Sequence, residues 1–174
     1  YDTNVLQANQ LKGLTTDQLS LLGTQAIQKL TSDQVKLLDA KQLAGLGSNQ
    51  IQALGDDVTV LSATQIKGLG TSQIQALTTD QVADLSAAQI KGLTTAQIAA
   101  IETQDLVKLG TDQLAALSAA QVKALSTGQV QSLGTDQVKG LQGTQIAAFS
   151  TDQIKALDTG QIASLETSQI KSLT

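Results

Sequence analysis

Apolar residues recur at two fixed places in a pattern that repeats every eight residues along almost the whole chain. We number the unit so that one copy runs from Gly134 at position one to Leu141 at position eight. Position five is always Ile, Val or Leu, and position eight is Leu in nearly every copy. Position four is Gln in 18 of 21 copies. A period this regular indicates a repeat architecture, in which each unit is stabilised by packing on its neighbours.

The octapeptide favours a short helix. Positions five and eight are three residues apart, which places their side chains on one face of a helix. Position one is mostly Ser, Thr, Asp or Gly, the types preferred at a helix N-cap, and Gln at position four completes the spacing of a capping box. Examples of this pairing are Thr15 with Gln18, Thr31 with Gln34, Thr78 with Gln81, Ser118 with Gln121 and Ser150 with Gln153.

We therefore predict an all-α solenoid of short two-turn helices, with one helix per octapeptide. Isolated helices need about 12–15 residues to be stable in water, so contacts between neighbouring units must hold these helices in place. The size of one coil is set by weaker signals. A spacing of sixteen residues favours about two octapeptides per coil and is seen at Lys123, Lys139, Lys155 and Lys171. A spacing of twenty-four, as from Lys12 to Lys36, leaves three per coil open.

Two other structures were weighed for the repeat. One continuous helix is excluded, because eight residues at about 100° each rotate the apolar stripe by about 80° per repeat, so no straight seam forms. A β-solenoid remains the alternative. Positions five and eight would face opposite sides of a straight strand, so that structure requires a bend in every unit.

One copy of the repeat is irregular. Between Leu54 and Leu61 a residue is missing, and Asp57 replaces the usual Gln. No linker or change of composition divides the chain, so we predict a single solenoid domain over residues 1–174 with a register break at 55–61. Asp56 and Asp57 are adjacent carboxylates, but two neighbouring Asp residues alone do not make a cation site. We interpret the break as a tolerated irregularity.

The composition argues against chemistry. The chain has no His, Cys, Met, Trp, Arg or Pro, so the usual general base, thiol nucleophile and metal ligands are missing. We therefore predict no catalytic, cofactor-binding or metal-binding residues, and a protein that is not an enzyme. The 11 Lys residues are scattered and the net charge is −4, which argues against nucleic-acid binding. No apolar stretch is long enough for a membrane span.

The repeated Gln and Lys residues have two interpretations each. The Gln side chains either cap helices and form an internal row of amides, or they bind a glycan or cross-link chains. The Lys side chains either form a solvated face or attract an anionic surface. In both cases we favour the first interpretation, because the position of Gln fits a capping box and singly placed Lys side chains usually keep a surface soluble.

The ends of the array favour self-association. The last copy, from Glu166 to Leu173, is close to the consensus, and Val5 and Leu6 lie almost at the start. Repeat arrays normally carry polar terminal units, and nothing here is typical of one. Copies are expected to stack end to end as a homo-oligomer, in a filament if the contact does not close. The alternative is that the chain is a piece of a longer array.

The segments Leu77–Leu85 and Leu117–Leu125 read LTTDQVADL and LSAAQVKAL. They resemble the octapeptide tracts of very large bacterial surface or secreted proteins of the adhesion type, some of which carry a haem-utilisation label. The resemblance covers nearly the whole chain. It implies an extracellular or cell-surface scaffold, as an adhesin stalk or filament subunit, with a binding module for a protein or glycan as the alternative. The haem label does not transfer, because this chain lacks His, Cys and Met.

Overall fold

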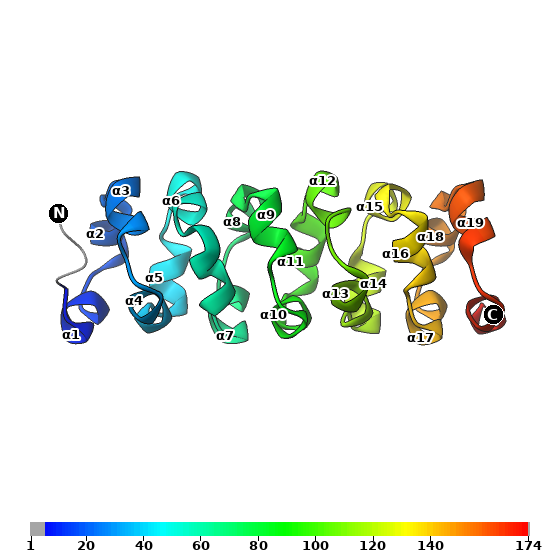
Figure 1. Cartoon of the computed structure of the whole chain (residues 1–174), viewed down its shortest axis with the longest axis horizontal. Helices are drawn as coiled ribbons and strands as arrows, with labels where there is room; N and C mark the ends of the chain where they lie inside the picture. The colour runs from blue at the N-terminus through cyan, green and yellow to red at the C-terminus, as the bar shows by residue number, and fades with distance from the viewer. Residues whose placement is uncertain (1–5, 174) are drawn as a thin grey trace.

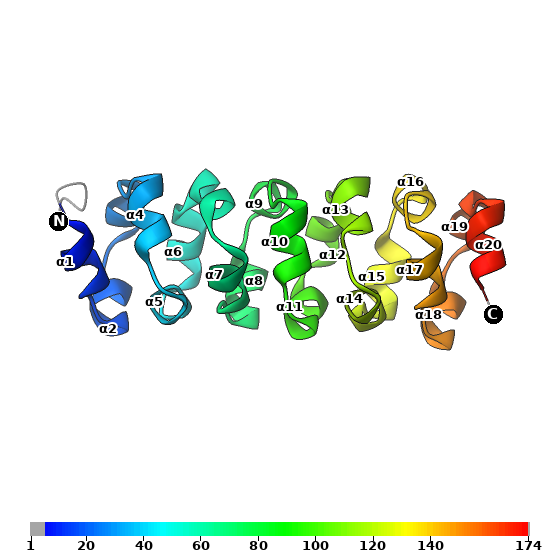
Figure 2. The same ribbon diagram turned by 90° about the horizontal axis from the view of Figure 1, so that it is seen from below.

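The computed structural model describes residues 6–173, which form a single series of short helices wound around one long axis (Figure 1). Over these residues there are twenty α-helices of four to six residues, one 3-10 helix and no strand. The predicted all-α solenoid with one helix per octapeptide is confirmed, and the β-solenoid alternative is wrong. The outline stays elongated when the molecule is turned by 90° (Figure 2).

Each coil of the solenoid contains three helices, so the prediction of about two octapeptides per coil is wrong. Every major contact between elements joins one element to the third one after it in the chain. The helices therefore stack in three columns, with seven coils along the axis. Each full turn of the solenoid takes three octapeptides, which is the spacing of twenty-four seen between Lys12 and Lys36.

The three columns contain the following elements. Column one is α1 (Ala8–Lys12), α4 (Ser32–Leu37), η2 (Gly55–Val60), α9 (Thr79–Ala83), α12 (Thr103–Leu106), α15 (Thr127–Ser132) and α18 (Thr151–Ala156). Column two is α2 (Thr16–Ser20), α5 (Ala40–Ala44), α7 (Ala63–Lys67), α10 (Ala87–Gly92), α13 (Thr111–Ala115), α16 (Thr135–Lys139) and α19 (Thr159–Ser164). Column three is α3 (Thr24–Gln28), α6 (Ser48–Ala53), α8 (Thr71–Ala76), α11 (Thr95–Ala100), α14 (Ala119–Ala124), α17 (Gly143–Ala147) and α20 (Thr167–Ser172).

The chain turns between helices at corners, which we define as positions eight and one. At a typical corner Leu125 (φ −60°, ψ 134°) and Ser126 (φ −69°, ψ 160°) are both extended. A connection that reverses the chain between antiparallel helices commonly uses a residue with positive φ. Among the described residues only Gly55 has positive φ. Each corner therefore turns the chain by part of a circle, and three corners complete a coil.

The spacing of sixteen residues between Lys side chains was misleading for a geometric reason. Lys123, Lys139 and Lys155 lie in α14, α16 and α18, which belong to three different columns. Their recurrence therefore reflects exposed positions on successive sides of the coil. It does not mark helices that stack on each other.

The core is a continuous apolar column inside the three stacks. Positions five and eight supply it, from Leu11 near the first coil to Leu165 near the last. Ile90 and Val122 at position five are fully buried, and Leu93 at position eight is 5% exposed. Since two branched side chains per repeat meet those of the coils before and after, burial is shared between units that are each too small to have a core.

The irregular copy forms the 3-10 helix η2 (Gly55–Val60), which stacks between α4 and α9. A 3-10 helix rises more per residue than an α-helix, which suits a unit that has lost one residue. Gly55 has φ +51°, a conformation that favours glycine. Val58 remains buried at 2% exposure, so the core passes through the break.

Small residues at position seven set the approach of coils in column two. A Cβ atom on Gly68 would lie 2.5 Å from the Cβ of Ala40 in the coil before, and one on Gly92 would lie 2.8 Å from the Cβ of Ala63. Gly45 and Gly140 meet Thr16 and Thr111 at 2.8 Å in the same way. Position seven of each coil therefore packs against position two of the preceding coil.

We expect Gly68→Ala to lower the free energy of unfolding by about 1–3 kcal/mol, because the added methyl group overlaps Ala40. Adding Ala40→Gly in the same chain should recover most of the loss. Gly128→Ala is the matched control: its Cβ meets nothing closer than 3.9 Å, so the higher helix propensity of Ala should stabilise the chain by about 0.4–1 kcal/mol. Urea denaturation measures all three, and a neutral Gly68→Ala variant would contradict the close approach.

Candidate functional site

The side chains of Gln at position four have two roles, and the first is to cap their own helices. In α11 the Thr94 hydroxyl accepts a hydrogen bond from the backbone N–H of Gln97 at 3.1 Å. The Gln97 side-chain carbonyl accepts from the Thr94 backbone N–H at 2.9 Å. The same reciprocal pair occurs at all five predicted boxes, for example in α9 and α18. The predicted capping boxes are confirmed.

The second role joins neighbouring coils. The Gln97 amide nitrogen donates to the backbone carbonyls of Ile66 at 2.8 Å and Leu69 at 2.7 Å. These carbonyls lie at the end of α7 and at the corner that follows it. The last carbonyls of a helix have no partner within the helix, so the amide satisfies groups that would otherwise need water. One side chain therefore links the corner before α11 to the corresponding corner of the preceding coil.

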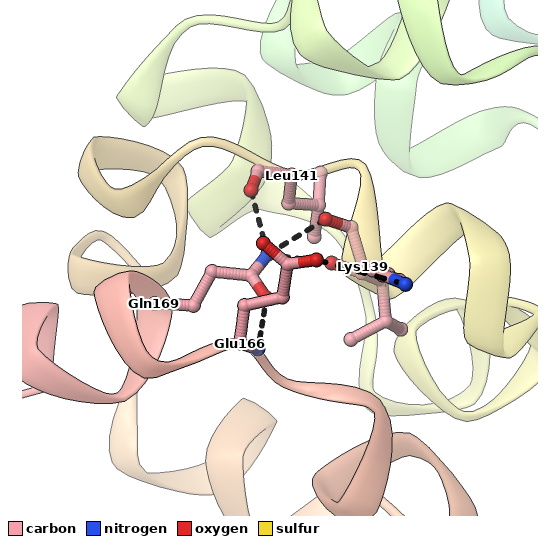
Figure 3. A network of polar contacts seen from close by, with 5 residues as sticks. Lys139, Leu141, Glu166 and Gln169 are labelled. Atoms are coloured by element: carbon pink, nitrogen blue, oxygen red, sulfur yellow. Dashed lines mark hydrogen bonds and ion pairs between the residues drawn. The ribbon is translucent and has the colours of Figure 1, made fainter.

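Figure 3 shows this arrangement in the last coil. The Gln169 amide nitrogen donates to the carbonyls of Val138, Lys139 and Leu141 at 2.9, 3.1 and 2.6 Å, and its carbonyl accepts from the Glu166 backbone N–H at 2.8 Å. The Lys139 ammonium lies 3.6 Å from the Glu166 carboxylate. Both side chains of that ion pair are more than half exposed, so we assign the cohesion of the corner to the amide.

These side chains form a series that we call the glutamine ladder, which is interrupted at Asp57 and Asp105. Each member accepts from a position-one N–H and donates to carbonyls of the preceding coil. The members are Gln34, Gln42, Gln50, Gln65, Gln73, Gln81, Gln89, Gln97, Gln113, Gln121, Gln129, Gln137, Gln145, Gln153, Gln161 and Gln169.

The amides of the glutamine ladder are internal. All members are buried except the half-buried Gln113, and Gln97 is only 2% exposed. Over residues 6–173, no buried side-chain nitrogen or oxygen lacks a hydrogen-bond partner. Amides that are buried and fully bonded cannot also hold a ligand, so the ladder is a row of inter-coil bonds, as the internal interpretation proposed. It offers no row of free amides to a glycan.

Three copies lack Gln at position four. In η2, Asp57 accepts from the Ser32 hydroxyl at 2.6 Å, and in α12 the buried Asp105 accepts from the Thr79 hydroxyl at 2.7 Å. Both Asp residues lie in column one and bond to a position-two hydroxyl of the coil before. In α3 the position holds Ala26. At these two positions the side chain therefore accepts a hydrogen bond from the coil before, whereas a ladder glutamine donates to its carbonyls.

The carboxylates give no sign of a metal centre. Asp56 is exposed, and its neighbour Asp57 is half-buried against Ser32. Over residues 6–173, no three or more His, Cys, Asp or Glu side chains lie together so that they could hold an ion. The charged side chains are mostly separate, with just two ion pairs in this part of the chain, Lys36 with Asp33 and Lys139 with Glu166.

The surface is furrowed between the stacked helices. One hollow runs along α7, α10, α11 and α14 and is lined by Lys67, Lys91, Thr94 and Thr95 among others. It follows the repeat, with one Lys from each of two successive coils in column two. No helix in the described part of the chain is long and apolar enough to cross a bilayer.

Comparison with known proteins gives one family. A family model described as the ALTTAQ repeat matches residues 55–87, 98–135, 123–151 and 138–174, which together cover well over half of the chain. Within the first of these matches, residues 77–81 read Leu-Thr-Thr-Asp-Gln and span a corner with its ladder glutamine. No curated protein matches this chain.

Proposed function

We propose that this chain, which belongs to the ALTTAQ repeat family, is a structural scaffold: a stiff, rod-shaped solenoid that acts outside a bacterial cell as an adhesin stalk or filament subunit. The observation that carries this proposal is the joint that recurs between coils. From α4 to α20 each coil is bonded to the one before by side-chain amides and a shared apolar core, although Asp57 and Asp105 replace the amide in two units of column one. A joint that recurs from coil to coil can hold a rod of many coils.

The extracellular bacterial setting rests on the resemblance of LTTDQVADL and LSAAQVKAL to the octapeptide tracts of large surface and secreted proteins. The composition agrees with a structural role. The surface carries scattered Lys and Asp side chains, and the repeated residues cap helices, form the corners or fill the core.

End-to-end stacking of copies is part of the proposal. Position five is buried in the interior coils, but in the last coil Ile162 is 43% and Ile170 53% exposed. At the other end of the rod, Leu21 is 85% exposed, and a hollow there is lined by Leu6, Leu14 and Leu22. These apolar side chains are the surface that stacking of copies would cover, and further repeats of a longer array would cover the same surface.

The test is electron microscopy of the purified chain, with small-angle X-ray scattering, across a concentration series. Seven coils at a helix spacing of about 8–10 Å give a rod of about 55–70 Å, and filaments should appear as concentration rises. A compact or strongly bent particle would overturn the rod. Rods of this length that stay discrete but bind a glycan or protein saturably would favour the alternative binding module.

A further inference from the structure

Position four of column one departs from the glutamine ladder in the middle of the rod. The carboxylate of Asp105 in α12 is 2% exposed and accepts from the Thr79 hydroxyl of the preceding coil at 2.7 Å. Asp57 in η2, two coils earlier, accepts from the Ser32 hydroxyl at 2.6 Å in the same way. Neither ion pair of the described chain includes Asp105. A buried carboxylate is costly unless it is paired or bound to a metal ion, so one hydroxyl leaves Asp105 under-compensated.

The main-chain groups opposite Asp105 across the joint are carbonyls. The ladder register sets position four opposite two carbonyls, 31 and 28 residues earlier in the chain, as at Gln97. For Asp105 these are the carbonyls of Ile74 and Leu77, at the C-terminal end of α8. The Ile74 carbonyl accepts from the Leu77 backbone N–H at 3.2 Å, and in the described chain no ladder amide bonds to either carbonyl. A carboxylate and the Thr79 hydroxyl oxygen therefore share this corner with two carbonyls, and the ladder supplies no donor there.

Such a set of oxygens has the chemistry of a hard cation site. Ca²⁺ binds about six to eight oxygens of carboxylates, backbone carbonyls and water at about 2.3–2.6 Å, in flexible geometry. Asp is one methylene shorter than Gln, so its carboxylate ends short of the place that the Gln97 nitrogen takes, 2.8 and 2.7 Å from two carbonyls. An ion near the corresponding place reaches the carboxylate and both carbonyls. These carbonyls end a helix, where a positive charge is favoured.

We propose that Asp105, Thr79 and the carbonyls of Ile74 and Leu77 form a binding site for a hard divalent cation of the size of Ca²⁺. The ion takes the bridging role that an amide nitrogen has elsewhere in the ladder, and water completes its coordination. The site contains one carboxylate and otherwise neutral oxygens, so it needs no cluster of acidic side chains. We assign it to Asp105 because Asp57 is only half-buried. The inference goes beyond the scaffold function and is independent of how rods associate.

The test is thermal unfolding of the whole chain in EDTA and in CaCl2, with tetramethylammonium chloride to match the ionic strength. A site with a single carboxylate should have a dissociation constant of about 1 mM, at the weak end for Ca²⁺ sites. CaCl2 at about ten times that concentration should raise the midpoint of unfolding by about 3–6 °C. MgCl2 should raise it clearly less, because Mg²⁺ demands near-ideal octahedral geometry. An unchanged midpoint in CaCl2, or an equal rise with both salts, would overturn the site.

Three variants locate the response. Asp105→Gln introduces the residue found at the other ladder positions, so in EDTA it should be more stable than the natural chain, and CaCl2 should not shift its midpoint. Asp112→Asn removes an exposed carboxylate from α13 and is the matched control, which should keep the full shift. A shift that survives in Asp105→Gln but disappears in Asp57→Asn contradicts the assignment to Asp105. None of these outcomes bears on end-to-end assembly, which microscopy judges separately.

Discussion

Replacing Gln97 by Glu is expected to lower the free energy of unfolding by about 3–5 kcal/mol. The substitution keeps the shape of the side chain and the oxygen that accepts from the Thr94 backbone N–H. It removes the amide nitrogen that donates to the carbonyls of Ile66 and Leu69. A carboxylate oxygen would then face two backbone carbonyls at a position that is 2% exposed. The variant therefore loses its inter-coil bonds and buries a charge among acceptors.

Gln18→Glu is the matched control, because Gln18 occupies the same position of the repeat in the first coil. Its side-chain carbonyl accepts from the Thr15 backbone N–H at 2.9 Å, and the side chain is exposed. A capping box accepts Glu as well as Gln, so this substitution should be close to neutral. If both variants lose the same stability, capping alone explains why Gln recurs at position four of this chain, and the inter-coil bonds contribute little.

Urea denaturation measures how much stability Gln97→Glu loses, and hydrogen exchange shows which segment of the chain is destabilised. The stability of a solenoid is a sum of unit and interface terms, so damage to one joint can open the rod locally. In Gln97→Glu, the amides near Leu69 and in α11 should exchange faster than those in α18. Uniform protection along the chain would contradict the assignment of the loss to one joint.

The sequence was sufficient to predict the local structure of the repeat. Position one and position four report the helix start, since a cap hydroxyl and a Gln three residues later satisfy each other within one unit, as Ser118 and Gln121 do. Positions five and eight indicate the buried face, because they lie three residues apart on one side of the helix. All of these relations join residues that are close in the chain, so a single octapeptide is enough to predict them.

The coil size and the second role of Gln could not be read from one unit. The partner of the Gln97 amide lies 28 to 31 residues earlier, and finding it requires knowing that three helices complete a coil. A signal was present in position seven, where Gly68 and Gly92 recur at the coil spacing of twenty-four. The spacing of Lys residues predicted the coil size less well, because an exposed side chain makes no contact that requires it to recur in the same column.

The exceptions at position four lead to the second large effect. Asp105→Gln is expected to raise the free energy of unfolding by about 2 kcal/mol, and so to give a chain more stable than the natural sequence. Asp105 is 2% exposed and accepts one hydrogen bond from Thr79. The ladder spacing places the carbonyls of Ile74 and Leu77 within reach of a Gln at this position, and no ladder amide bonds to them in the described chain.

The gain has two sources that a second variant separates. Gln in place of Asp105 removes a buried carboxylate and adds a side-chain amide whose nitrogen donates to two carbonyls. Asp105→Asn removes the charge but leaves the side chain one methylene short of the ladder geometry. If the ladder bonds carry the effect, Gln stabilises the chain by clearly more than Asn, whereas equal gains assign the effect to the lost charge. Denaturation of the three chains side by side decides between them, and a Gln variant that is less stable than the natural chain would mean that column one depends on the bond between Thr79 and Asp105.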